Sequence, residues 1–335
     1  MKKRNILLTA LVCAALAAAA VPAVPVLRNR ASCTESGFAM DTAVTVTLTG
    51  ADSEAAAKEA MAVVKHLEQT CLSRTVSTSD IARANRNGSA RVSADTAKIM
   101  EQTLALCRQS GGALDIGLGA LSDLWAVKQN RTPPAAQDVA ALIEAGYEKI
   151  QLQGNTLTVE APAAADLGAV GKGAACDTVK AYLGTKRITR GVVAVGGSVL
   201  FYGSGDFTVG ISSPERGSAA CIATVTTGAG CVSTSGTYER YFDYEGVRYH
   251  HILNPETGYP VQNGLTGVTV FSQSGLQSDA LATACFVMGM EKGAAFALKM
   301  GCEALFTRED GRIFATAGIY DKVTVTDPAY TLEQL

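Results

Sequence analysis

Two residues near the C-terminal end of the chain, Asp279 and Thr283, have the types and the spacing of a metal site. They stand four residues apart in an apolar segment that is predicted to be a helix, with Ser278 as its N-cap. This spacing places a carboxylate and a hydroxyl on one helix face. Both are hard oxygen donors, which Mg²⁺ accepts while it keeps waters and substrate phosphate oxygens as other ligands. A structural interpretation is also open, in which Asp279 complements the helix dipole and Thr283 bonds to its own helix.

Two adjacent histidines precede this helix. His250 and His251 are two of the three histidines in the chain, and they follow a Tyr- and Arg-rich segment with the pattern of a hairpin. In a strand their side chains point to opposite faces, so only one of them enters a site. The unperturbed pKa of a histidine suits proton removal near neutral pH. A hydrolase triad of Ser235, His251 and Asp279 is disfavoured, because no Gly-x-Ser-x-Gly motif surrounds Ser235.

A glycine-rich turn at residues 166–177, with the sequence DLGAVGKGAACD, leads into a segment that is predicted to be helical as far as Leu183. Exposed amides at a helix start attract anions and Lys172 adds a positive charge, so this turn is a candidate phosphate site. It is not a Walker A sequence, because only two residues separate its first two glycines and Gly173 replaces the hydroxyl that binds Mg²⁺. Close packing of the helix would also account for one or two of these glycines.

The composition limits the class of protein. The chain has 335 residues, enough for one large domain or two intimate lobes. Its formal net charge of −2 excludes a global basic field, so nucleic acid is not an expected partner. The nine cysteines form neither a Cys-x-x-Cys pair nor a Cys/His cluster, which argues against a zinc or iron–sulfur site.

The first 30 residues have the pattern of a targeting segment. Three basic residues follow Met1, and residues 6–27 form an Ala-rich apolar run. This pattern predicts a secretory signal peptide or an anchor that ties the protein to the membrane, and the basic flank keeps the N-terminus in the cytoplasm. Residues 31–335 are then expected outside the cytoplasm, either secreted or anchored to the cytoplasmic membrane. Whether the segment is cleaved stays open, because the apolar run contains small residues that suit a cleavage site and is also long enough to span a membrane.

The remaining chain mixes helical periodicity with clusters of short strands. Alternating polar and β-branched residues predict a strand at 38–48, and Ser53 is expected to cap a helix that reaches about Thr70. Residues 73–88 are rich in Ser, Thr and Asn and predict a surface loop. Further helices are expected at 94–110 and 138–145, a hairpin at 150–159, and short strands at 192–195, 199–203, 207–211, 222–227 and 268–271. Sequential strands without regular βαβ alternation indicate an α+β fold, with mixed or antiparallel sheets and packed helices.

The motifs between residues 38 and 323, taken together, resemble the ApbE family of bacterial flavin transferases, which take FMN from FAD and attach it to a protein. Each motif is weak alone, but they follow one another in the order that the family shows. They are Met40-Asp41-Thr42, Leu114-Asp115-Ile116, Leu124-Trp125, residues 166–173 with Asp177, Gly196-Gly197, Thr234-Ser235-Gly236, His251-Ile252-Leu253-Asn254-Pro255, and Asp279 with Thr283. The resemblance implies a single flavin-transferase domain at 31–335.

The resemblance also implies roles for particular residues. Asp279 and Thr283 would bind Mg²⁺, together with a backbone carbonyl near Ala169. His251 is the candidate base for the proton of the acceptor hydroxyl, since its unperturbed pKa suits proton removal near neutral pH. A Thr or Ser hydroxyl of an acceptor flavoprotein, in an extracytoplasmic or membrane redox system, would attack the FMN phosphorus, and AMP would leave. The FAD site would be lined by Met40, Ile116, Gly117, Leu118, Asp166, Lys172 and Leu253.

The chain departs from the family pattern at five positions. Asp41 replaces a usual Gly, Ala120 a usual Pro, Ala169 a usual Gly and Asn254 a usual Asp, while Thr75 stands about where many members carry a flavin-stacking Tyr. These changes concern the packing and affinity of the flavin more than the chemistry. Two alternatives stay open: Mg²⁺-dependent hydrolysis of FAD to FMN and AMP, and a non-catalytic flavin-binding protein of the cell surface.

Overall fold

The largest element of the fold is a nine-stranded mixed sheet. The computed structural model describes residues 31–215 and 220–335. The strand order is β1-β2-β6-β7-β10-β13-β14-β15-β17, and neighbouring strands are antiparallel except for β15 and β17. The strands are β1 (Ser32–Ala39), β2 (Thr42–Gly50), β6 (Ile188–Val195), β7 (Ser198–Gly203), β10 (Gly230–Gly236), β13 (Leu265–Ser272), β14 (Glu303–Arg308), β15 (Arg312–Ala315) and β17 (Thr331–Gln334).

A two-residue turn joins β1 to β2. Met40 and Asp41 form this turn, with φ values of 51° and 61°. Two consecutive positive φ values define the type I′ hairpin turn, whose backbone twist matches that of the flanking strands. The prediction of one strand at 38–48 is therefore wrong, because the alternation of residue types continues through a turn that contains no glycine.

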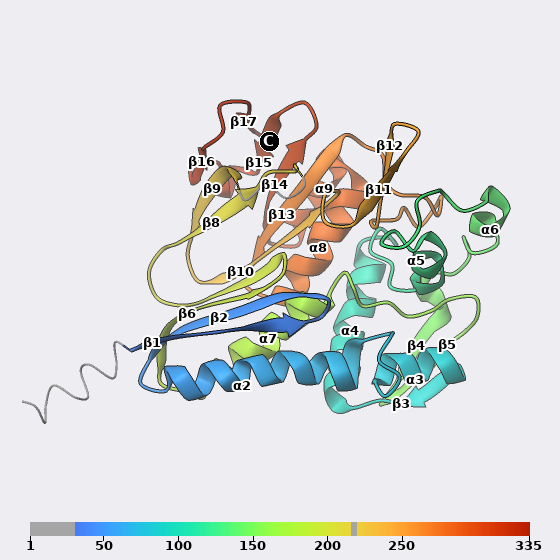
Figure 1. The fold of residues 1–335 in the computed structure, drawn as a ribbon, viewed down its shortest axis with the longest axis horizontal. Coiled ribbons are helices and arrows are strands. Elements are labelled where there is room, and N and C mark those ends of the chain that lie inside the picture. Colours follow the sequence, from blue (N-terminus) through green and yellow to red (C-terminus); the bar gives the residue numbers. More distant parts are fainter. Residues whose placement is uncertain (1–30, 216–219) are drawn as a thin grey trace, which may run out of the picture.

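Four helices form a layer on one face of the sheet (Figure 1). Each helix packs against the next one and against the strands beneath it: α2 against β1 and β2, α7 against β6 and β7, α8 against β10 and β13, and α9 against β14. A π-helical segment, η1, continues α2 to Leu72, close to the predicted end of that helix. Their bounds are α2 (Ser53–His66), η1 (Leu67–Leu72), α7 (Gly171–Leu183), α8 (Gly275–Met288) and α9 (Met290–Lys299).

A three-stranded sheet covers the opposite face. Its order is β16-β9-β8, and its apolar side chains pack with Phe201, Val232, Phe271 and Leu305 of the large sheet. The neighbouring residue Cys231 belongs to the core on the helical side, as the alternation of side chains along a strand requires. The elements of this layer are β8 (Phe207–Ser212), β9 (Cys221–Thr227) and β16 (Val323–Val325), with the short helix α10 (Ala317–Tyr320) beside them.

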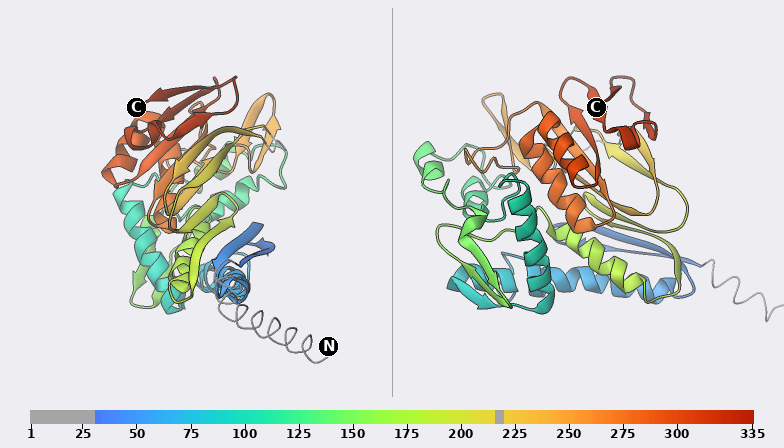
Figure 2. Two further views of the ribbon diagram at one scale, coloured as in Figure 1. Left: turned by 90° about the vertical axis from the view of Figure 1, so that its left-hand side faces the viewer. Right: turned by 180° about the vertical axis from the view of Figure 1, so that it is seen from behind.

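A second lobe lies beside these layers (Figure 2). Its small sheet has the order β3-β5-β4. One hydrophobic core joins the lobes, because Ile99 and Leu157 of this lobe belong to the same buried cluster as Val44 and Val268. The predicted α+β fold of two intimate lobes is confirmed. The elements are α3 (Asp80–Asn87), β3 (Ser89–Arg91), α4 (Ala94–Gln109), α5 (Gly119–Trp125), α6 (Ala136–Ala140), η2 (Tyr147–Lys149), β4 (Ile150–Gln153) and β5 (Thr156–Val159).

The second lobe also contains two errors of the sequence prediction. The segment 73–88 is not a loop throughout, because α3 occupies its second half. Ser79 caps this helix by accepting a hydrogen bond from the Ala82 N–H at 3.1 Å, and the helix is so polar that its sequence has the composition of a loop. The helix predicted at 138–145 ends instead at Ala140, and turns follow it.

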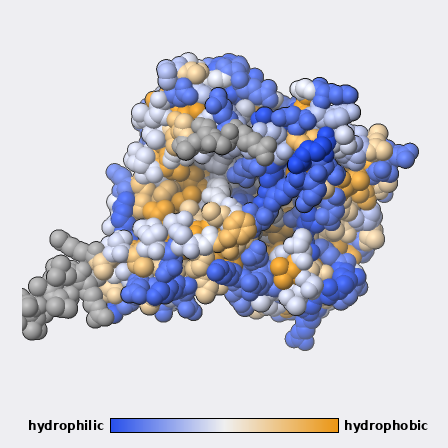
Figure 3. Space-filling model, in the orientation of Figure 1, coloured by the Kyte–Doolittle hydropathy of each residue, from blue (hydrophilic) through white to orange (hydrophobic). Residues whose placement is uncertain are grey.

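The Tyr- and Arg-rich segment forms the hairpin that the sequence predicts. Its strands are β11 (Tyr241–Tyr244) and β12 (Val247–His250), which pair in antiparallel register. Hydrophilic residues gather around this hairpin on the molecular surface (Figure 3).

Within residues 31–215 and 220–335, no helix has both the length and the apolarity to cross a membrane. The predicted targeting segment at 1–30 lies outside the described residues.

Candidate active site

A cavity of about 1070 Å³ lies where the two lobes meet. Eleven site residues are predicted from the sequence, and nine of them line this cavity. The two others do not: Ile116 is fully buried in the core, and Gly117 donates its N–H to Asp115 Oδ1 at 2.7 Å. The nine lining residues are Met40, Leu118, Asp166, Ala169, Lys172, His251, Leu253, Asp279 and Thr283.

The helix that carries Asp279 begins earlier than its sequence predicts. Ser274, not Ser278, is the N-cap of α8, and it accepts a hydrogen bond from the Gln277 N–H at 3.3 Å. Asp177 of α7 supplies further acceptors, because its carboxylate binds the Ser274 hydroxyl and the Gly275 N–H, both at 2.7 Å. This long-range cap, which local sequence cannot reveal, moves Asp279 into the second turn, where it is 2% exposed.

A contact between two glycines brings α7 against α8 at the site. A Cβ on Gly173 would lie 2.0 Å from the Gly275 carbonyl oxygen, so only glycine fits this contact. The close approach lets the Gly173 N–H donate to Asp279 Oδ2 at 2.9 Å. On the same carboxylate, Oδ1 lies 3.5 Å from Lys172 Nζ, which also donates to the Gly168 carbonyl at 3.2 Å. The glycine-rich turn thus holds Asp279, while its Gly168, Gly171 and Gly173 N–H groups already donate within the protein.

Thr283 lies one turn beyond Asp279 and bonds to another element. Its hydroxyl lies 3.0 Å from the Ser235 hydroxyl of β10. Both residues line the cavity, although Ser235 is not among the predicted metal or flavin residues. Because Ser235 bonds to Thr283, and His251 bonds to the Arg240 carbonyl, the geometry does not support a Ser-His-Asp triad.

These oxygen donors fit a magnesium ion. Asp279 supplies a buried carboxylate, Thr283 a hydroxyl on the same helix face, and Ala169 lines the same cavity from the glycine-rich turn. No group of three or more His, Cys, Asp and Glu side chains that could hold a metal occurs among the described residues. A single carboxylate with a hydroxyl and a carbonyl is a donor set for a hard cation that keeps waters and phosphate oxygens.

The two histidines point in different directions. His250 is buried away from the cavity, with Nε2 2.8 Å from the Val261 carbonyl and Nδ1 accepting the Ile252 N–H. His251 lines the cavity, and its Nδ1 lies 3.3 Å from the Arg240 carbonyl. Of the two histidines, only His251 lines this cavity, which agrees with the divergence of neighbouring side chains along a strand. Burial, the positive charges of Arg240 and Lys172, and nearby His250 lower the pKa of His251 to about 3, so its imidazole is neutral at pH 7.

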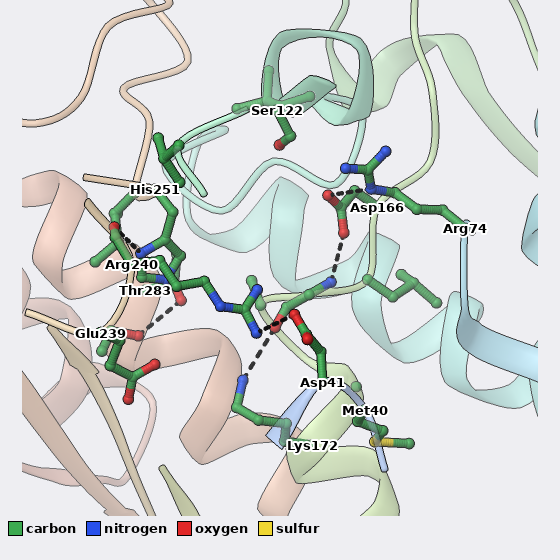
Figure 4. Close-up of a pocket in the computed structure, with 18 of the residues that line it drawn as sticks. Met40, Asp41, Arg74, Ser122, Asp166, Lys172, Glu239, Arg240, His251 and Thr283 are labelled. Carbon is green, nitrogen blue, oxygen red and sulfur yellow. Dashed lines mark hydrogen bonds and ion pairs between the residues drawn. The ribbon is translucent and has the colours of Figure 1, made fainter. Parts of the chain in front are cut away.

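A further cation, Arg74, holds two carboxylates on the cavity lining. Its Nε lies 2.9 Å from Asp166 Oδ2 (Figure 4). Its Nη1 lies 2.6 Å from Asp123 Oδ1. Asp166 Oδ1 also accepts the Gly168 N–H at 2.9 Å, which fixes the glycine-rich turn. No local pattern in the sequence marks Arg74, because its partners are distant in the sequence.

The charges of the cavity lining favour a cation. Its four basic side chains each pair with a carboxylate of the lining. Seven carboxylates line the same cavity, so they outnumber the basic groups. Burial raises the pKa of Asp115 to about 7 and also raises the pKa of Glu239, yet five carboxylates would still face four cations if both were protonated. The carboxylates are Asp41, Glu68, Asp115, Asp123, Asp166, Glu239 and Asp279, and the basic residues are Arg74, Lys128, Lys172 and Arg240.

Comparison with known proteins assigns this arrangement to a family. Residues 40–306 match the model of the ApbE family. The chain is 34% identical over 311 residues to an FAD:protein FMN transferase of Treponema pallidum (strain Nichols), a match that covers 85% of each chain. Its fold is similar to the crystal structure of the ApbE protein of Thermotoga maritima MSB8, with a TM-score of 0.78, 28% identity, and coverage of 84% of this chain and 96% of that one. A variant of the flavin transferase ApbE from Vibrio cholerae gives a TM-score of 0.76 at 27% identity, over 86% of this chain and 98% of that one. The chain therefore belongs to the ApbE family.

Proposed function

We propose that this protein is a Mg²⁺-dependent transferase that moves the FMN part of FAD to a Thr or Ser hydroxyl of an acceptor protein and releases AMP. The observation that carries the proposal is the convergence of Asp279, Thr283, Lys172 and His251 on one cavity of about 1070 Å³. The names of its relatives, FAD:protein FMN transferase, support the flavin transfer itself. The N-terminal sequence pattern supports an extracytoplasmic acceptor, in a redox system at or beyond the membrane.

Residues of this chain can take the proton of the acceptor hydroxyl and can bind the negative charge of the pyrophosphate. Neutral His251, with Nδ1 directed to the Arg240 carbonyl, has Nε2 available to take the proton of the acceptor hydroxyl. The hydroxyl oxygen then bonds to the FMN phosphorus, the bond from that phosphorus to the AMP oxygen breaks, and AMP carries away the electron pair. Lys172 binds the pyrophosphate oxygens through its ammonium group. A magnesium ion held by Asp279, Thr283 and the Ala169 carbonyl would neutralise charge on those oxygens.

The test is an assay of covalent flavin. The purified full chain is incubated with FAD, MgCl₂ and the extracytoplasmic and membrane proteins of its source bacterium. We expect a fluorescent flavin band that survives denaturing electrophoresis, AMP in equal amount to the bound FMN, and loss of both with EDTA. Release of FMN and AMP without a labelled band would identify hydrolysis of FAD instead. FAD binding without either product would identify a flavin-binding protein and contradict the proposal.

A further inference from the structure

Three charged side chains from distant segments meet at the rim of the cavity, and the metal and base assignments do not use them. Asp41 lies in the β1–β2 turn, Lys128 follows α5, and Arg240 lies between β10 and β11. Arg240 Nη2 lies 3.1 Å from Asp41 Oδ2, and Lys128 Nζ pairs with the same oxygen. Figure 4 shows the Arg240 side chain extended towards Asp41. All three residues line the cavity.

Asp41 occupies a backbone position that most residues avoid. Its φ of 61° follows a φ of 51° at Met40, a combination that favours Asn-Gly or Gly-Gly. Asp tolerates this conformation, but the hairpin needs no carboxylate there. The carboxylate instead reaches two cations that belong to other segments. The ion pairs with Arg240 and Lys128, and not the geometry of the turn, therefore explain why an aspartate stands at position 41.

Arg240 connects this rim to the predicted base. Its carbonyl lies 3.1 Å from the His251 backbone nitrogen, which donates to it, and 3.3 Å from His251 Nδ1. After burial, the positive charge of Arg240 is the next cause of the lowered pKa of His251, and Lys172 acts in the same direction. Both cations therefore lie within electrostatic reach of the imidazole. A phosphate held by Arg240 and Lys172 would lie beside His251, where the acceptor hydroxyl must be deprotonated.

We propose that Arg240 is a phosphate-binding residue of the flavin nucleotide site and that Asp41, with Lys128, is the positioning residue that holds its guanidinium in the cavity. The proposal rests on the proposed function in taking FAD as the ligand. A guanidinium presents five N–H donors in a planar fork that matches two phosphate oxygens. Asp41 is its one ion-pair partner in the described part of the chain, so donors stay available to a ligand. The side chains of the pair are 37% and 54% exposed, so the pair is weak enough for phosphate oxygens to take over the contact.

The test compares two ligands that differ in phosphate. Binding of FAD and of riboflavin to the full chain is measured by flavin fluorescence at fixed MgCl₂, for the wild type, Arg240→Ala and Arg248→Ala. Arg248 is the matched control, because it is 39% exposed and pairs with Asp243 at 3.2 Å but lies outside this cavity. We expect Arg240→Ala to weaken FAD binding about 10- to 100-fold, as the loss of a charge-assisted hydrogen bond implies, and to leave riboflavin binding within about twofold.

The control variant should bind both ligands as the wild type does. Equal losses of FAD and riboflavin affinity in Arg240→Ala, or no loss of FAD affinity, would overturn the proposal. Arg240→Lys should recover part of the FAD affinity, because lysine keeps the charge and loses the fork. These are binding measurements, so they stand whether or not the wild type transfers FMN. A wild type that binds FAD without transfer would contradict the proposed function alone.

The positioning role of Asp41 has its own test. Asn tolerates the left-handed backbone, so Asp41→Asn keeps the turn and removes the charge that anchors Arg240. We expect this variant to weaken FAD binding about threefold to tenfold, and to have no further effect when Arg240 is already alanine, because residues that act through one another are not additive. Tighter FAD binding in Asp41→Asn, or the same loss in both backgrounds, would show that Asp41 does not act through Arg240.

Discussion

The buried wall and the exposed rim of the cavity hold their charges in different ways. On the wall, formed by α7, α8 and β10, the Asp279 side chain is 3% exposed and a backbone N–H fixes one of its oxygens. On the rim, the carboxylates of Asp41 and Asp123 are 54% and 66% exposed, and their ion-pair partners are the side chains of Lys128, Arg240 and Arg74. Buried charges that lose a partner are costly, whereas exposed pairs contribute little. The wall is therefore pre-organised for chemistry, and the rim is suited to exchange its partners for a ligand.

Removing the charge of the wall should have the largest effect. Asp279→Asn keeps the size of the side chain and removes the carboxylate that the proposed magnesium site requires, so we expect no measurable FMN transfer at any Mg²⁺ concentration. The matched control is Asp243→Asn, a carboxylate of the β11–β12 hairpin outside the cavity. The labelled-flavin assay measures both. An Asp279→Asn variant that reaches wild-type transfer at saturating Mg²⁺ would remove Asp279 from the metal site.

His251 comes next, because it lies where the wall meets the rim. His251→Ala should slow transfer about 10²- to 10⁴-fold, the range for loss of a general base, with little change in FAD affinity. A single-turnover assay with FAD affinity measured in parallel tests this. His250→Ala should retain transfer, since His250 faces away from the cavity. A comparable loss of transfer in the folded His250 variant would contradict the assignment.

The pH profile of transfer sharpens this prediction. The pKa of His251 is lowered to about 3, chiefly by burial, so the base form is present at neutral pH and is lost only as the pH falls towards that value. The unperturbed pKa would instead place this loss near pH 6.5. The profile of kcat/KM, which reports the free enzyme, should therefore show no His251 ionisation between about pH 5 and 8. A limb near neutral pH that disappears in His251→Ala would contradict the lowered pKa.

Local sequence was sufficient for the parts of the site that depend on spacing. Asp279 and Thr283 share a helix face, and His250 and His251 diverge, because helix and strand periods fix these relations. The place of Lys172 in the cavity lining could be predicted, because the residue lies in a glycine-rich helix start. The same local logic predicted α4, α7 and the β4–β5 hairpin, whose capping residues and turns are short-range features.

Contacts between distant segments account for the residues that the sequence did not reveal. The start of α8 depends on Asp177, which lies far away in the sequence. The polar strand β10, which carries Ser235, shows no alternation of polar and apolar residues, because it lies in the middle of the sheet. Arg74 reaches Asp166, and Arg240 reaches Asp41, across gaps in sequence that no pattern spans. A single sequence therefore predicts residues related by a local period better than residues that pair across the cavity.

The glycine contact on the wall should matter more for stability than other glycines of the same helix. Gly173→Ala would place a methyl group 2.0 Å from the Gly275 carbonyl, and we expect it to lower the free energy of unfolding by about 1–3 kcal/mol, the usual cost of overpacking. Gly184→Ala is the matched control at the other end of α7, because its Cβ would have no neighbour closer than 3.4 Å. Urea unfolding at pH 7 measures both. Equal stability of the two variants would mean that the helices separate without cost.

The smallest effect on stability should come from Asp123, the most exposed carboxylate of the rim. Asp123 and Asp166 pair with the same guanidinium, that of Arg74, so their effects can be compared directly. Asp123→Asn removes a partner that is 66% exposed, so the free energy of unfolding should change by no more than about 0.5 kcal/mol. Asp166→Asn removes a partner that is 24% exposed and also accepts the Gly168 N–H, so a loss of about 1–2 kcal/mol is expected. Because Asp166 fixes the glycine-rich turn, its variant should also bind FAD more weakly than Asp123→Asn. Urea unfolding and flavin fluorescence on the two variants measure these differences, and the reverse order would mean that exposure does not decide which charges of the cavity are held in place.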